Sequence, residues 1–214
     1  MSKIAFVGGK LVDGTGAAPV EDSLVLVDDK KIAYAGPRTE VPEGYEVRDI
    51  QGRTIMPGLI DTHLHFSGNL TDNDNDWVIE SVAQKQACAV KQSWDALSHG
   101  LTTVCEIGRN GIAIRDLVNM GVMEGPRIFA TGLGFCRVAG HGDCHQLPQQ
   151  ISKEGHPWGD QVDGPWDLRK AVRRRLRENP DAIKIWATGG GIWHWDSGRD
   201  QHYCYEEIKA VCDE

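Results

Sequence analysis

The sequence predicts an α/β protein in which a small β-sandwich segment, residues 1–53, precedes the first half of a TIM (β/α)8 barrel, residues 54–214. Three observations support this prediction. The first 53 residues alternate short β-type runs with turn residues. From Thr54 onward, strands alternate with amphipathic helices, a pattern typical of βαβ units and a parallel sheet. No G-x-G-x-x-G stretch opens a helix, which favours a closed barrel over an open doubly wound sheet.

The N-terminal segment consists of short runs of β-forming residues separated by GG, DGTG, DDKK and PEG. This punctuation is typical of small antiparallel strands, and no helical period of useful length interrupts it. The predicted strands are Lys3–Val7, Leu11–Val12, Ser23–Val27, Lys31–Gly36 and Val47–Ile50.

Strand and helix patterns alternate through the rest of the chain. We expect strands in IMPGLIDTHLHF, LTTVCEIG, GPRIFATGL and AIKIWATGG, and a long Gly/His/Pro-rich loop that ends near residue 164. The predicted helices cover residues 76–98, 111–123, 165–179 and 205–214. The last helix is cut at residue 214, so we expect the chain to be a fragment of a longer protein.

The amino-acid composition argues against two classes of binding partner, nucleic acids and membranes. The chain has 23 Lys and Arg against 31 Asp and Glu, a net charge of −8, which argues against a nucleic-acid partner. The basic run Arg169–Arg177 has apolar residues at helical spacing and indicates a solvated helix face. Six single cysteines, no signal peptide pattern and no apolar run of about 18 residues predict a cytoplasmic protein without a membrane partner.

Two histidines lie at the end of the first predicted barrel strand. Because strand side chains repeat with period two, His63 and His65 point to the same face and can chelate one metal ion. The C-terminal end of a barrel strand is also where active sites form. The alternative is a pair of exposed or core-packed histidines, since this spacing is common.

The sequence around these histidines, IMPGLIDTHLHF, resembles the signature Pro-Gly-hydrophobic-x-Asp-x-His-x-His of the amidohydrolase superfamily. GGKLVDGTG, LVDDKKIAYAG, GLTTVCEIG, GPRIFATGLG and AIKIWATGGG extend the likeness over the whole chain. The likeness is to the imidazolonepropionase-related and Xaa-Pro dipeptidase (prolidase-like) branch. It implies a metal-dependent hydrolase barrel, here the N-terminal half only, and metal-binding roles for His63 and His65.

Lys184 lies in the fourth predicted strand among apolar neighbours, where an uncompensated ammonium group would be costly. The resemblance implies that this lysine is carboxylated by carbon dioxide and then binds the metal ions, which gives it a catalytic role. The alternative is a lysine whose ammonium group reaches water at the strand end.

The loop RVAGHGDCHQLP follows the third predicted strand. Related enzymes carry a similar Gly-His-Gly loop over the active site, so the resemblance implies that His141 contacts the substrate or an oxyanion. The alternative is a separate zinc cluster of His141, Cys144 and His145, for which no partner at the usual spacing follows.

A Gly/Trp-rich loop follows the fourth predicted strand. Trp193, His194 and Trp195 are expected either to wall a substrate pocket or to pack as a lid, and Arg199 or His202 could meet a substrate carboxylate. The second strand of the family branch often continues as Thr-x-x-Arg-Asp. Here the acid is preserved as Glu106 and the arginine is lost, so no role follows for this position.

The resemblance implies hydrolysis of a C–N bond in a small amide, cyclic amide or dipeptide by a water molecule activated by one or two divalent metal ions, with zinc the usual choice. Only three of the six expected metal-binding and catalytic groups are present, so the isolated chain is expected to be inactive. The alternative is a non-catalytic half-barrel that acts as a structural or interaction module. A homo-oligomer is compatible with either.

Overall fold

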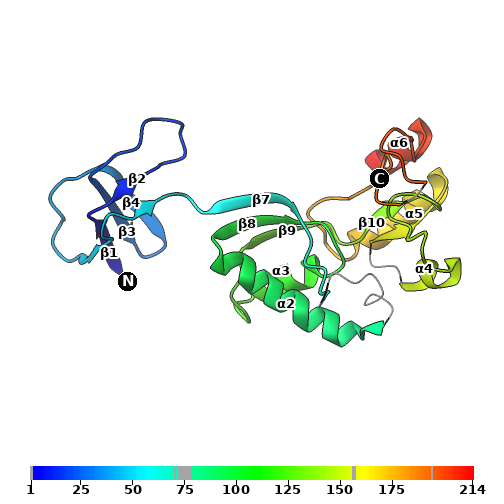
Figure 1. Cartoon of the computed structure of the whole chain (residues 1–214), viewed down its shortest axis with the longest axis horizontal. Coiled ribbons are helices and arrows are strands. Elements are labelled where there is room, and N and C mark those ends of the chain that lie inside the picture. Colours follow the sequence, from blue (N-terminus) through cyan, green and yellow to red (C-terminus); the bar gives the residue numbers. More distant parts are fainter. Residues whose placement is uncertain (1, 70, 72–78, 156–157, 194) are drawn as a thin grey trace. The chain divides into compact units, whose positions relative to one another are not determined.

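The computed structural model of the 214-residue chain describes residues 2–69, 71, 79–155, 158–193 and 195–214. The chain divides into two compact units, Met1–Gly58 and Leu59–Glu214 (Figure 1). No helix among the described residues is both long and apolar enough to cross a membrane.

The N-terminal unit contains a four-stranded sheet in the order β4-β3-β1-β5 and a two-stranded sheet of β2 and β6. Alternate residues of β1 and β3 form its core, with Ala5 and Leu24 fully buried. The strands are β1 (Lys3–Val7), β2 (Lys10–Leu11), β3 (Ser23–Asp28), β4 (Lys31–Pro37), β5 (Glu46–Asp49) and β6 (Thr54–Ile55).

All five strands predicted in this unit are present, but the expectation of antiparallel pairing is only partly correct. β3 pairs antiparallel with β1 and β4, whereas β5 pairs parallel with β1, and β6 parallel with β2. After β4 the chain crosses to the free edge of β1, and it enters β5 in the direction of β1. Turn residues mark where strands end but carry no information about such a crossover.

The C-terminal unit begins with a parallel sheet in the order β7-β8-β9. Its strands are β7 (Leu59–Leu64), β8 (Leu101–Glu106) and β9 (Arg127–Ala130). Helices α2 (Val82–Ser98) and α3 (Gly111–Asn119) cover one face (Figure 1). The core between helices and sheet consists of Phe66, Ala89, Val104, Ile114, Ile128 and Ala130.

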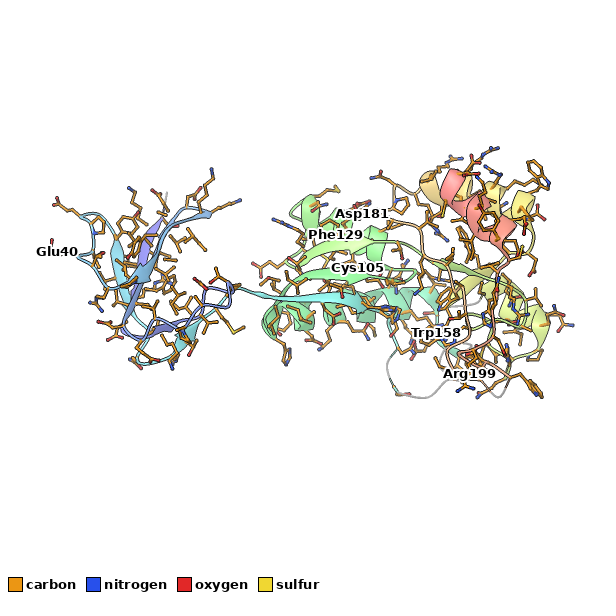
Figure 2. The ribbon with its side chains drawn as sticks, turned by 90° about the horizontal axis from the view of Figure 1, so that it is seen from above. Glu40, Cys105, Phe129, Trp158, Asp181 and Arg199 are labelled. Atoms are coloured by element: carbon orange, nitrogen blue, oxygen red, sulfur yellow. The ribbon has the colours of Figure 1, made fainter. Side chains whose placement is uncertain are left out.

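The other face of this sheet is partly open. Phe129 is 48% exposed although its neighbours Ile128 and Ala130 are buried, as expected for a strand covered on one side only. Cys105 pairs with Phe129 across β8 and β9, and both are labelled in Figure 2.

The remainder of the unit packs around a second core of Phe135, Val162, Leu168, Ala171, Val172 and Tyr203. It comprises β10 (Gly134–Cys136), α4 (Gln149–Gly155), β11 (Gly159–Gln161), α5 (Pro165–Leu176) and α6 (Tyr205–Asp213). β10 and β11 pair in parallel. The stretch up to residue 164, predicted to be one long loop, thus contains two strands and a helix.

The fourth predicted barrel strand, residues 182–190, is not a continuous strand. It forms a parallel bridge from Ile185 to Phe135 and an antiparallel bridge from Thr188 to Gln201. Backbone hydrogen bonds on both sides of Phe135, to Lys184 and Trp186, hold the segment beside β10. An apolar run indicates burial, but a ladder also needs a partner strand of matching length, and β10 has three residues.

The predicted helices are present with shorter ends. α2 begins at Val82 because Ser81 and Gln84 form a capping box, while residues 76–78 of the predicted helix lie outside the described residues. α3 ends at Asn119 and α5 at Leu176, each a few residues before the predicted end.

Candidate functional site

A cavity of about 320 Å³ lies within the C-terminal unit. It brings together four of the side chains singled out from the sequence: His63, His65, His141 and Lys184. The first two come from β7 and the residue after it, His141 from the loop after β10, and Lys184 from the segment beside β10. The other residues that line it are Trp158, Ile185, Trp186, Ala187, Thr188, Gly189, Gly190 and Ile192.

His63 and His65 lie next to each other, with ring centroids 5.2 Å apart. His65 Nδ1 lies 2.5 Å from the carbonyl oxygen of Ile107, to which it donates a hydrogen bond, so Nε2 is left for another ligand. The backbone N–H of His63 donates to Asp61 Oδ1 at 2.9 Å. Burial, aided by the nearby charges of His63 and Lys184, lowers the pKa of His65 and favours the neutral imidazole that binds metals.

Lys184 is half-buried, and its Nζ lies 5.3 Å from the ring centroid of Trp186. Burial lowers the pKa of Lys184, and the nearby Cys105 thiol opposes this shift. The Lys184 side chain thus lines the cavity and lies over the ring of Trp186.

No group of three or more His, Cys, Asp and Glu side chains in the described part of the chain is arranged to bind a metal ion. The alternative zinc cluster of His141, Cys144 and His145 is therefore wrong. Cys144 is buried, and the ring of His145 packs against Trp193 with centroids 6.0 Å apart. The loop turns these side chains toward different neighbours.

Asp196 was not identified from the sequence, yet it contacts His141 directly. Its side chain is fully buried, and Oδ2 accepts a short hydrogen bond from His141 Nδ1. Burial opposes ionisation, but the bonds from His141 and the Gly190 amide hold the pKa of Asp196 below its usual value. No sequence spacing links positions 141 and 196, which only the fold brings together.

In the predicted Gly/Trp loop, one tryptophan is buried and the other is exposed. Trp193 is 9% exposed and donates from Nε1 to the carbonyl oxygen of His141 at 2.9 Å, so it supports the loop of His141 and does not line the cavity. Trp195 is 75% exposed. Arg199 is exposed and also lies outside the cavity lining, and His194 falls outside the described residues.

Three apolar residues that line the cavity were not identified from the sequence as part of a site: Trp158, Trp186 and Ile192. The Trp158 ring, labelled in Figure 2, lies 5.9 Å from that of His65, and the Trp186 ring lies 6.4 Å from that of His141. The sequence places Trp158 in a Gly/Pro-rich loop, but this pattern does not indicate which side of the loop faces the cavity.

Glu106 is the last residue of β8 and is fully buried. Its Oε1 accepts from the backbone N–H of Phe66, the residue after His65, at 3.0 Å. Burial raises the pKa of Glu106 to about 7, although the amides of Phe66, Gly111 and Gly108 oppose the shift. The acid therefore anchors the end of β7 without facing the cavity.

Comparison with known proteins identifies a protein family whose profile matches this sequence. The profile of the Amidohydrolase family matches residues 54–214. Ochratoxinase of Aspergillus niger is 30% identical to the chain over 225 residues, which cover 96% of this chain and 46% of that protein.

Solved structures of similar sequence share the fold. A prolidase complexed with N-methylphosphonate-L-proline superposes with a TM-score of 0.83 at 27% identity, over 100% of this chain and 53% of that one. A Xaa-Pro dipeptidase with bound methionine in the active site gives a TM-score of 0.78 at 27% identity, over 99% and 53%. The chain thus spans about half the length of these relatives.

Proposed function

The chain belongs to the amidohydrolase family, and from this premise we propose that it is part of a metal-dependent hydrolase that cleaves a C–N bond in a small amide, cyclic amide or dipeptide. The observation that carries the proposal is the shared cavity of His63, His65 and Lys184. These are the side chains for which the sequence resemblance implies metal binding.

We propose that these residues hold a divalent metal ion, for which zinc is our first choice and one or two ions are allowed. Two imidazoles and a lysine that can be carboxylated, all lining one cavity, support this proposal. His63 and His65 would bind through ring nitrogens, and the carbonyl oxygen of Ile107 already orients His65 for this role. Lys184, once carboxylated, would supply an anionic oxygen in the same cavity. A bound metal ion supplies Lewis acidity and lowers the pKa of a water molecule that it holds.

The chain's own residues would position the substrate. His141 faces the cavity with Nδ1 engaged by Asp196, which leaves Nε2 to contact a substrate carbonyl, carboxylate or leaving nitrogen. Trp158, Trp186 and Ile192 would exclude water from the apolar part of the substrate. Arg199, which is exposed on the following loop, is proposed to meet a substrate carboxylate. Trp193 supports the loop of His141 instead, and His194 lies outside the described residues.

We propose further that residues 54–214 form the first half of a TIM barrel and that residues 1–214 alone lack hydrolase activity. The exposed Phe129 face of the β7-β8-β9 sheet supports the half-barrel. The cavity lining contains three of the six groups that the resemblance implies, His63, His65 and Lys184, which supports the lack of activity. Residues 1–53 would form the β-sandwich segment. All six cysteines are free thiols, which a reducing setting such as the cytoplasm would preserve.

Zinc binding to the purified chain tests the proposal, with His63→Asn and His65→Asn as variants. Each substitution should weaken zinc binding at least about tenfold in calorimetry, since even residues that only orient metal ligands have effects of about that size. His99→Asn is the matched control, because His99 is exposed and bonds only near its own helix end. Equal zinc affinity in all four proteins would contradict the metal site.

Activity is measured in parallel on dipeptides and lactams. We expect no turnover by residues 1–214 alone with zinc and bicarbonate present. Metal-dependent turnover that His63→Asn abolishes would confirm the chemistry and contradict the proposed inactivity of the isolated chain.

A further inference from the structure

Asp196 is a buried carboxylate that joins three parts of the C-terminal unit. Oδ2 accepts from His141 Nδ1, and also from the backbone N–H of Ile192 at 3.4 Å. Oδ1 accepts from the backbone N–H of Gly190 at 3.1 Å, and His202 Nε2 lies 3.8 Å from it. The two amides belong to the loop that lines the cavity, whereas Asp196 itself is not part of the lining.

The protonation pattern around this carboxylate follows from its partners. The backbone N–H of His141 donates to His202 Nδ1 at 3.4 Å, so the hydrogen of a neutral His202 ring is on Nε2, toward Asp196. The ring of His141 contacts Oδ2 through Nδ1, which must therefore carry the hydrogen of a neutral His141 ring. Asp196 is thus surrounded by N–H groups alone, the arrangement that an ionised carboxylate requires.

The packing around His141 is equally specific. A methyl group on Gly190 would lie 2.1 Å from Cε1 and 2.6 Å from Nε2 of the His141 ring. The backbone at Gly190 therefore touches the ring where any side chain would displace it. The same residue donates its N–H to Asp196, so one short loop both contacts the ring and fixes the acid that holds it.

We propose that Asp196 is the positioning residue for His141: it holds the ring through Nδ1–H and thereby presents an unprotonated Nε2 to the substrate cavity. The neutral ring accepts a hydrogen bond or a proton at Nε2, and Asp196 stabilises the imidazolium that results. The ring then returns the proton through Nε2, and Nδ1–H stays with Asp196 throughout. This role deepens the proposed function, on which it rests only for the identity of the substrate.

Asp196→Asn tests the proposal because the hydrogen bonds of the site favour one orientation of the new amide. Each oxygen faces one backbone N–H and one histidine ring, but the backbone bond at Oδ1, from Gly190 at 3.1 Å, is shorter than the one at Oδ2, from Ile192 at 3.4 Å. The amide oxygen should therefore stay at the Oδ1 position, where it keeps the better bond. The amide NH2 then occupies the Oδ2 position and donates to Nδ1 of His141. The hydrogen of the ring must move to Nε2, and the tautomer is reversed.

The measurement is a long-range 1H–15N correlation spectrum of the 15N-labelled chain at about pH 8.5, about two units above the ordinary pKa of a histidine side chain. His141→Gln assigns the signals. We expect Nδ1–H in the wild-type protein and Nε2–H in Asp196→Asn. Asp143→Asn is the matched control, since Asp143 is also buried in this unit but bonds to Ala139 and Ser152, and it should leave the His141 signals unchanged.

An Nε2–H tautomer in the wild-type protein would overturn the proposal, as would an unchanged tautomer in a folded Asp196→Asn protein. If that variant does not fold, the wild-type spectrum and the spectrum of Gly190→Ala test the proposal instead. The alanine should displace the His141 ring and abolish its hydrogen bond to Asp196, while the carboxylate stays in place. None of these spectra requires metal or substrate. A failed zinc titration would contradict the proposed function and leave this inference standing.

Discussion

Glu106 should make the stability of the chain depend on pH in the range where most carboxyl groups are already ionised. The side chain is fully buried, and its pKa is raised from 4.5 to about 7. Among the described residues, Oε2 has no hydrogen-bond partner of normal geometry. An acid in this setting prefers to be neutral, because ionisation would place a poorly solvated charge at the buried end of β8.

The magnitude follows from linkage. A raised pKa in the folded state means that the contribution of Glu106 is fully present below pH about 4.5, and is lost as the pH rises to about 7. The rise of this pKa from 4.5 to about 7 corresponds to roughly 3 kcal/mol of unfolding free energy. The Glu106→Gln side chain stays neutral and should remove this dependence.

The assay is urea unfolding of both proteins at several pH values between about 4.5 and 8. The difference in unfolding free energy between wild type and Glu106→Gln should change by roughly 3 kcal/mol across this pH range, in favour of the glutamine variant at high pH. Effects of the other carboxyl groups cancel in this difference, because both proteins carry them. Glu124→Gln, an exposed position in the same unit, is the control and should give a constant difference. A constant difference for Glu106→Gln as well would refute the reasoning.

Three further predictions concern the core, the loop and the lysine. Leu168→Ala should lower the unfolding free energy by about 2–5 kcal/mol in urea titrations, because Leu168 is fully buried, and Leu176→Ala, half exposed at the end of the same helix, should cost much less. Trp193→Phe removes the hydrogen bond to the carbonyl oxygen of His141 and should cost about 1 kcal/mol in the same assay; no loss would show that the indole N–H contributes nothing. With zinc and 13C-bicarbonate, the chain should show a carbamate carbon signal that Lys184→Arg abolishes, and a signal that survives would place the carbamate elsewhere.

Local sequence patterns determined much of the N-terminal unit and several helices. Turn residues around Lys3–Val7 and Ser23–Asp28 predict strands at these places, since alternation and turn chemistry act over a few residues. The capping pair of Ser81 and Gln84 likewise determines where α2 begins. The order of strands in the sheet, with β5 parallel to β1, depends on a crossover that no local pattern encodes.

The sequence alone identified the family motif and the His63, His65 and Lys184 set, because H-x-H at a strand end is a local pattern and the motif order is specific. Only the tertiary structure brought Asp196 to His141, Trp158 to His65, and Glu106 to the amide that follows His65. Even the shortest of these separations, between Phe66 and Glu106, is 40 residues along the chain. Burial and hydrogen bonding between distant segments depend on how the whole chain packs, and that packing decided which side chains support the cavity.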